Sequence, residues 1–117
     1  MNRTELNGYL LGKKASEETY PFGAETAVFK VLGKMFAIVP ASDPLQMSVK
    51  CDPDFAEVLR ENYEAVTPGY HLNKRHWNTV QIDGTIPDDE LEEMIDVSYN
   101  LVVAKMTKKD QFKLDEM

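Results

Sequence analysis

Residues 45–62 read Leu-Gln-Met-Ser-Val-Lys-Cys-Asp-Pro-Asp-Phe-Ala-Glu-Val-Leu-Arg-Glu-Asn and predict a strand followed directly by a helix. Over Leu45–Cys51 apolar and polar side chains alternate strictly, which is typical of a strand with one buried and one wet face. Asp52 is a good N-cap residue and Pro53 suits the first helical position, so a helix begins there. A half-wet strand next to an amphipathic helix indicates that helices cover only one face of a sheet.

The same patterns predict the remaining elements on both sides of this stretch. Apolar stripes mark helices, and runs of β-branched and aromatic residues mark strands. The predicted elements are a helix over 4–14 capped by Thr4, strands over 26–32, 35–39 and 45–51, a helix from 52, strands over 65–70 and 77–82, and a helix over 87–106. Pro68 cannot donate to a strand ladder, so its strand either lies at an edge or contains a bulge.

The predicted fold is therefore α+β, with two layers and the order α-β-β-β-α-β-β-α. One five-stranded, mainly antiparallel sheet carries all helices on one face, and residues 15–24 form a loop. The predicted core consists of Leu6, Leu10, Phe36, Ile38, Met47, Val49, Phe55, Leu59, Val80, Ile82, Leu91, Ile95 and Val102, with Leu101 at its margin.

The chain is expected to be one domain over residues 1–117, with a polar tail from about 107 that tends to fray. No run approaches the roughly 18 apolar residues of a membrane span, and the N-terminus does not look like a secretory signal. Cys51 is the only cysteine, so an internal disulfide is excluded. These features indicate a cytoplasmic protein that does not contact a membrane.

The formal net charge of −7 is unevenly distributed. Residues 52–64 and 83–106, both predicted to be mainly helical, hold most of the carboxylates. Residues 24–51 and 65–82, predicted to be mainly strands, carry a small positive excess. If the helices cover one face of the sheet, the other face and its hairpins are locally basic.

Residues 65–83 contain both histidines, the only tryptophan and the only Lys-Arg pair of the chain. Cations beside aromatic rings can contact phosphates and stack on bases, although a solvated hairpin around a packed tryptophan explains the same pattern. In a regular strand Trp77 shares a face with Thr79 and Gln81, opposite to the buried Val80. Either a bulge turns Trp77 into the core or it lies on the wet face.

No pattern in the sequence predicts catalysis, a metal site or a cofactor. On one strand the odd spacing of His71 and His76 would place them on opposite faces, so a shared metal would need a loop between them, and Cys51 has the buried parity typical of an inert thiol. The carboxylates of 88–96 could hold a cation, but acidic groups are favourable at a helix N-terminus in any case. The chain also lacks a phosphate-binding glycine loop and a nucleophile elbow. We therefore expect that it is not an enzyme.

The run Thr67–Val80, Thr-Pro-Gly-Tyr-His-Leu-Asn-Lys-Arg-His-Trp-Asn-Thr-Val, resembles the MmcQ/YjbR-like family. Tyr-Pro-Phe-Gly at 20–23, Asp-Gly at 83–84, Pro-Asp at 87–88 and Ser-Tyr at 98–99 extend the resemblance over nearly the whole chain. The resemblance implies a small bacterial cytoplasmic protein with the element order given above. It also implies a fold similar to type III secretion chaperones and frataxin, and a double-wing arrangement that binds DNA.

Two functions are compatible with these observations. In the first, the protein binds DNA weakly through phosphate contacts at its hairpins. The residues expected to contact DNA are Lys30, Lys34, Lys50, His71, Asn73, Lys74, Arg75, His76 and Trp77. In the second, the protein is a small adaptor whose acidic helices face a basic protein partner, and it does not bind nucleic acid.

Overall fold

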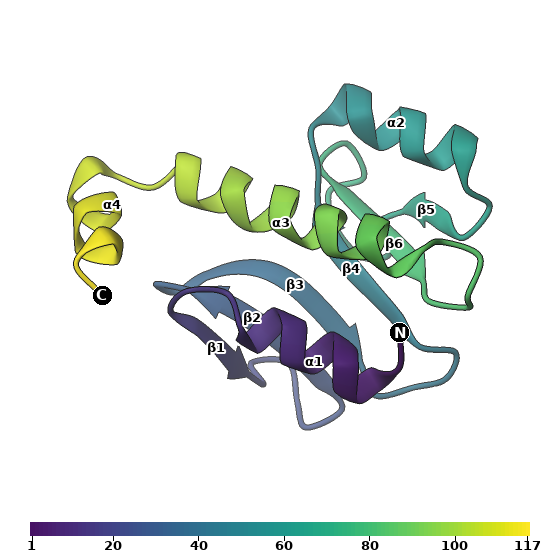
Figure 1. Ribbon diagram of the computed structural model, residues 1–117, viewed down its shortest axis with the longest axis horizontal. Coiled ribbons are helices and arrows are strands. Elements are labelled where there is room, and N and C mark those ends of the chain that lie inside the picture. Colours follow the sequence, from purple (N-terminus) through teal and green to yellow (C-terminus); the bar gives the residue numbers. More distant parts are fainter.

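Six strands form one sheet in the computed structural model, which describes residues 1–117 (Figure 1). The strands are β1 (Ser16–Thr19), β2 (Thr26–Val31), β3 (Lys34–Pro40), β4 (Gln46–Lys50), β5 (Val66–Pro68) and β6 (Trp77–Gln81). Their order across the sheet is β1-β2-β3-β4-β6-β5, and every neighbouring pair is antiparallel. The predicted α+β fold is confirmed, and Pro68 lies on an edge strand as expected.

The sixth strand, β1, corrects the predicted number of strands. Its sequence Ser-Glu-Glu-Thr has no apolar alternation, so nothing in the pattern of 15–24 predicts a strand. β1 forms because it pairs along the edge of β2, from Ser16 opposite Val31 to Thr19 opposite Val28. Tertiary pairing therefore overrides a weak local preference.

Four helices accompany the sheet: α1 (Arg3–Leu11), α2 (Pro53–Asn62), α3 (Asp88–Ala104) and α4 (Lys108–Asp115). Asp52 caps α2, as predicted, by accepting a hydrogen bond from the Asp54 amide at 3.0 Å. α1 is capped by Asn2 rather than by Thr4, because Asn2 and Glu5 form a reciprocal capping box. α4 lies in the predicted polar tail, and its Leu114 is buried.

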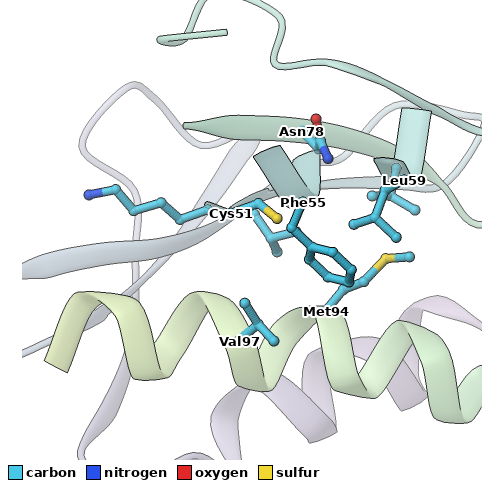
Figure 2. A pocket seen from close by; sticks show the side chains of 9 residues that line it. Cys51, Phe55, Leu59, Asn78, Met94 and Val97 are labelled. Atoms are coloured by element: carbon cyan, nitrogen blue, oxygen red, sulfur yellow. The ribbon is translucent and has the colours of Figure 1, made fainter. Parts of the chain in front are cut away.

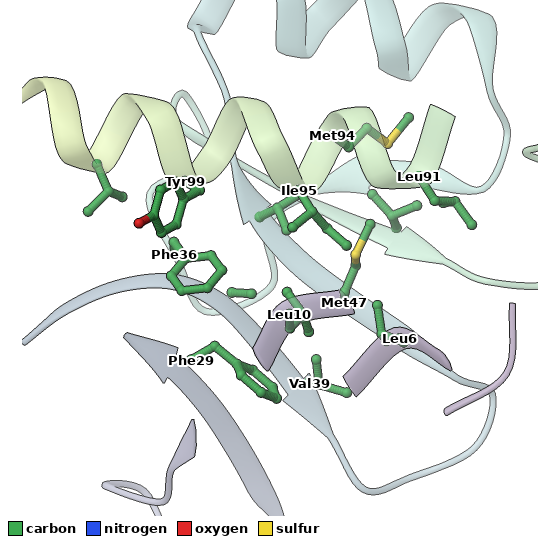
Figure 3. Packing of buried hydrophobic residues seen from close by; sticks show 14 of the residues in the cluster. Leu6, Leu10, Phe29, Phe36, Val39, Met47, Leu91, Met94, Ile95 and Tyr99 are labelled. Carbon is green, nitrogen blue, oxygen red and sulfur yellow. The ribbon is translucent and has the colours of Figure 1, made fainter. Parts of the chain in front are cut away.

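Apolar residues of α1 and α3 pack on one face of the sheet (Figure 3). Leu6, Leu10, Leu91 and Ile95 meet strand residues such as Phe29, Val39 and Met47, and all of these side chains are buried. Phe36 meets Tyr99 edge to face, with ring centroids 5.3 Å apart. The sheet and the helices thus form two layers around one core.

Most of the predicted core is confirmed. Its buried members are Leu6, Leu10, Phe36, Ile38, Met47, Val49, Val80, Leu91, Ile95 and Val102. Leu59 and Ile82 are half-buried against the same cluster. Phe55 was wrongly predicted, because Ala56 is the residue of α2 that is fully buried, and the Phe55 ring is 43% exposed.

The register of the strands defines the face that the helices leave uncovered, which we call the open face. Met47 and Val49 belong to the core, so their alternating neighbours Ser48 and Lys50 point to the opposite side. Ser48 lies between Ile38 and Thr79 in the register, so these side chains share the open face. Ile38 is therefore buried as predicted, but on this side of the sheet.

Tyr9 joins α1 to α3, because its Oη donates to Asp96 Oδ1 at 2.6 Å. Lys13 Nζ donates to the same oxygen at 2.7 Å. Burial and the neighbouring Asp96 raise the pKa of Tyr9 to about 12. Burial opposes ionisation of Asp96, but its bonds to Lys13 and Tyr9 outweigh that effect, so the pKa of Asp96 is lowered.

We expect Asp96→Asn to lower the pKa of Tyr9 without returning it to the ordinary value near 10. The reason is that the substitution removes the anion but not the burial. Since the pKa of Tyr9 is raised on folding, its contribution to stability is complete below about pH 10 and is lost as pH rises toward 12. NMR of the Tyr9 ring across alkaline pH measures the shift. Asp89→Asn is the control, and an unchanged Tyr9 titration in Asp96→Asn would contradict the prediction.

Candidate nucleic-acid interface

The open-face residues of β4 and β6 form three directly opposed pairs. They are Gln46 with Gln81, Ser48 with Thr79, and Lys50 with Trp77. Ser48 Oγ and Thr79 Oγ1 lie 2.8 Å apart and share a hydrogen bond. The centre of the open face is therefore polar, and it ends in a lysine beside an indole ring.

Trp77 is buried although it lies on the open face. Its register with Lys50 is regular, so no bulge turns it into the core, and it shares a face with Thr79 and Gln81 as predicted. Only 6% of the residue is exposed. The loop after β5 lies close to it, since a Cβ added to Gly69 would be 2.7 Å from Trp77 Cβ. Lys50 Nζ lies 5.9 Å from the centre of the indole ring.

Three lysines surround a groove at this end of the sheet, which we call the lysine groove. Its volume is about 360 Å³, and its lining is Lys34, Met35, Lys50, Trp77, Val102, Lys105 and Met106. No carboxylate belongs to the lining. Burial lowers the pKa of Lys50, and the nearby charge of Lys105 lowers it further. Cations that repel one another around an apolar floor are suited to bind a phosphate or another anion.

Lys105 is the functional residue that sequence reasoning missed. It was counted within the acidic block 83–106, whereas it is the C-cap residue of α3. The C-terminal end of α3 reaches the strand ends that carry Lys34 and Lys50, although these lysines are distant from Lys105 in the sequence. Its place at a helix C-terminus, where a cation is favourable, was the only signal in the sequence.

Other predicted contact residues have structural roles in the hairpin between β5 and β6. Lys74 Nζ donates to the Gly69 carbonyl at 3.0 Å. Asn73 Oδ1 accepts from the Arg75 amide at 3.0 Å, and the Asn73 carbonyl accepts from the amides of His76 and Trp77. The Arg75 side chain is exposed and makes no hydrogen bond. Of these residues, Arg75 is therefore the cation best placed to meet a ligand.

Arg60 of α2 fixes the same hairpin. Its Nε donates to Asn78 Oδ1 at 2.7 Å, and its Nη2 donates to the carbonyls of Lys74 and Trp77. Asn78 is almost completely buried, so this charge-assisted bond satisfies a group that water cannot reach. The hairpin is consequently held from the helix side as well as by its own strands.

Lys30 lies on the open face but outside the lysine groove. It is half-buried, opposite Glu17 of β1 and Met35 of β3. The structure therefore brings together Lys34, Lys50 and Trp77 from the predicted set, and it places Lys30 apart from them.

A second hollow on the open face, which we call the aromatic cleft, lies between two loops. Its volume is about 440 Å³, and its lining is Phe22, Thr26, Ile38, Pro40, Gln46, Ser48, Tyr70, His71 and Leu72. The loop after β1 supplies Phe22, and the loop after β5 supplies Tyr70, His71 and Leu72. Both loops belong to the segments on which the family resemblance rests.

The β5–β6 side of the cleft is fixed in an unusual backbone conformation. His71 has a φ of +59°, which is uncommon for a residue with a side chain and often occurs at functional sites. Its ring lies 4.0 Å from that of Tyr70 between centroids. The Tyr70 amide donates to Thr79 Oγ1 at 3.2 Å. The sheet therefore anchors the backbone that presents these rings.

Cys51 belongs to a different region, between α2, α3 and the sheet (Figure 2). It is buried, as predicted, and burial followed by the charge of Asp52 raises the pKa of its thiol. Phe55, Leu59 and Met94 converge beside it. The enclosed space is about 10 Å³, too small for anything beyond a water molecule.

Three carboxylates of α3 have partners within the chain. The N-terminal amine pairs with Asp88 at 3.0 Å, Lys13 pairs with Asp96 at 2.7 Å, and Tyr63 donates to Glu90. No group of three His, Cys, Asp or Glu side chains has an arrangement that could hold a metal ion. None of the helices has the length and apolar character needed to cross a membrane.

Comparison with known proteins identifies relatives over most of the chain. The YjbR family model matches residues 11–101. The uncharacterised protein YjbR of Escherichia coli is 35% identical over 104 residues, which cover 88% of each chain. The uncharacterised protein YbdF of Escherichia coli is 37% identical over 99 residues, covering 81% of this chain and 79% of YbdF.

Solved structures show the same fold. The crystal structure of Deinococcus radiodurans protein DR2400 is similar with a TM-score of 0.89 and 43% identity, covering 96% of this chain and 86% of that one. A crystal structure of a Pseudomonas syringae protein is similar with a TM-score of 0.76 and 26% identity, covering 87% of this chain and 99% of that one.

Proposed function

The chain belongs to the YjbR family, and from this membership together with the lysine groove we propose that it binds nucleic acid, mainly through phosphates. The observation that carries the proposal is the meeting of Lys34, Lys50 and Lys105 around one groove that has no carboxylate in its lining. Trp77 provides an apolar floor beside them.

The acidity of the whole chain does not prevent local binding of an anion. Asp96 is the carboxylate of α3 nearest in sequence to Lys105, and nine residues of helix separate them by about 14 Å. This distance exceeds the Debye length of about 8 Å at physiological salt. Asp96 is also paired with Lys13. The carboxylates of α3 therefore do not cancel the charge of the lysine groove, although the formal charge of the chain is −7.

The geometry implies weak binding with little sequence preference. Three lysines neutralise few phosphates, and no helix is presented for insertion into a DNA groove. We expect dissociation constants of about 10⁻⁴–10⁻⁶ M, and a salt slope of about 0.9 per phosphate contacted on duplex DNA.

Reversing both exposed cations of the groove, Lys34→Glu with Lys105→Glu, is expected to abolish binding even at low salt. Neither side chain is buried, so the fold should persist. Fluorescence anisotropy with labelled mixed-sequence duplex DNA across a salt series measures the effect. Arg75→Glu alone, in the otherwise wild-type chain, reports whether the hairpin also contacts DNA.

Glu93→Lys is the matched control for this experiment, because it changes a charge on the exposed side of α3. It should leave binding unchanged or strengthen it. Absence of wild-type binding at low salt, or undiminished binding by the double reversal, would refute the proposal. Asp96 is unsuitable as a control site, since changing it disrupts the contacts with Tyr9 and Lys13.

One observation favours the second candidate, a protein adaptor. Phe55 and Val58 of α2 are 43% and 46% exposed, and they line a groove of about 170 Å³ that also includes Glu90 and Glu93. An apolar groove with an acidic rim suits a basic amphipathic segment of a partner. NMR titration with such a peptide should shift Val58 and Met94 if this function holds, whereas DNA should shift Lys34 and Lys105.

A further inference from the structure

Two of the most exposed aromatic side chains of the protein line the aromatic cleft. Phe22 is 68% exposed and Tyr70 is 70% exposed, whereas Phe29 and Phe36 are completely buried. Phe22 and Tyr70 come from different loops, and the loops are more than forty residues apart in the chain. Exposed apolar side chains gathered around a hollow mark a surface that binds a ligand or a partner, and aromatic rings favour stacking with another flat ring.

The cleft is organised before any ligand arrives. The Tyr70 amide is bonded to Thr79, Lys74 Nζ holds the Gly69 carbonyl at 3.0 Å, and His71 is fixed at positive φ. A ring that stacks on Tyr70 or His71 therefore does not have to order the loop, which reduces the entropic cost of binding.

The lining of the cleft indicates the chemistry of its ligand. It contains no lysine, arginine, aspartate or glutamate, so the part of a ligand that enters is uncharged. The amide of Gln46 and the hydroxyls of Thr26 and Ser48 can exchange hydrogen bonds with the edge of a ring. The favoured ligand is therefore a flat, neutral ring that has hydrogen-bonding groups at its edge and stacks on aromatic side chains. A nucleobase has these properties.

Strand β4 contributes residues to both the aromatic cleft and the lysine groove. Ser48 lines the cleft and Lys50 lines the groove, and both point to the open face of β4. Two residues of a strand span about 6.6 Å. One nucleotide chain can therefore place a base in the cleft and a neighbouring phosphate in the groove.

We infer that the aromatic cleft receives an unstacked base of single-stranded nucleic acid whose backbone continues into the lysine groove. This inference rests on the proposed function and narrows its substrate class. Bases within a duplex are stacked and paired, so they cannot enter the cleft unless they are first extruded. Single strands should consequently bind more tightly than duplexes of the same length.

The test compares a short labelled oligothymidylate with an abasic strand of the same length, by fluorescence anisotropy at low salt. The wild type should bind the base-bearing strand about tenfold more tightly, as is usual for stacking on an aromatic side chain. Phe22→Ala with Tyr70→Ala should remove this ratio while binding of the abasic strand remains. Phe112→Ala, which changes a 67% exposed ring on α4, should preserve the ratio.

The outcomes separate this inference from the proposed function. Equal binding of both strands by the wild type, or a ratio that persists in the double variant, overturns the base site but leaves phosphate binding intact. If neither the base-bearing strand nor the abasic strand binds, the proposed function and the base site are both overturned. If thermal unfolding shows that the double variant is not folded, Phe22→Ala alone repeats the test in a loop outside the helices and strands.

Discussion

Gly69→Ala is expected to destabilise the protein by about 1–3 kcal/mol, the usual cost of forcing extra atoms into a packed site. The added Cβ would lie 2.7 Å from Trp77 Cβ and 3.1 Å from the Trp77 carbonyl oxygen. The Gly69 amide donates to that same oxygen at 2.9 Å, so the backbone cannot move away without losing the bond. Denaturant unfolding of the variant and the wild type measures the change in free energy.

Gly8→Ala is the matched control, with an effect of the opposite sign. Gly8 lies inside α1, and no atom is within 4 Å of the position of its missing Cβ. Alanine should stabilise this helix by about 0.5–1 kcal/mol, because glycine loses more backbone entropy on folding. A neutral Gly69→Ala would show that Trp77 does not pack against the loop as described.

Ile95→Ala is expected to lower the free energy of unfolding by about 2–5 kcal/mol. Ile95 is completely buried where α3 meets the sheet, so truncation loses apolar burial and leaves a cavity. Domains of this size are commonly stable by only about 5–15 kcal/mol, and the variant should unfold at clearly lower denaturant concentration. Urea unfolding followed by circular dichroism measures the difference.

The control for Ile95→Ala is Leu11→Ala, which removes a comparable side chain at a 45% exposed position of α1. Its effect should stay within about 0.5 kcal/mol. Similar losses at both positions would contradict the packing of α3, since they would place Ile95 on the surface or Leu11 in the core.

The strength of the local signals explains which elements could be predicted. The alternation over 45–51 and the Asp52-Pro53 start signal fix β4 and α2, because burial and capping act on the residues that carry them. β1 has only polar residues and forms through pairing with β2. No local sequence pattern predicts this pairing. Phe55 has the periodicity of a core residue, yet the position of α2 leaves it partly exposed.

The candidate site was less predictable, because it depends on distant segments that meet in space. Lys34, Lys50 and Trp77 were identified from charge and composition, and the fold brings them together. Lys105 was not predicted, because the rest of its helix is acidic. The presence of Phe22 and Tyr70 in the lining of one cleft depends on loop conformations, including the positive φ of His71, that strand and helix patterns do not encode.

The two outer strands of the sheet limit how the protein can associate with itself. An edge strand with free amide and carbonyl groups can recruit a strand from another molecule and start aggregation. β5 has three residues and ends in Pro68, which has no amide hydrogen to offer. β1 has four residues and carries Glu17 and Glu18, so two copies approaching along this edge repel each other. The sheet therefore stops at six strands, and neither of its edges offers a long row of free backbone groups to a second copy of the chain.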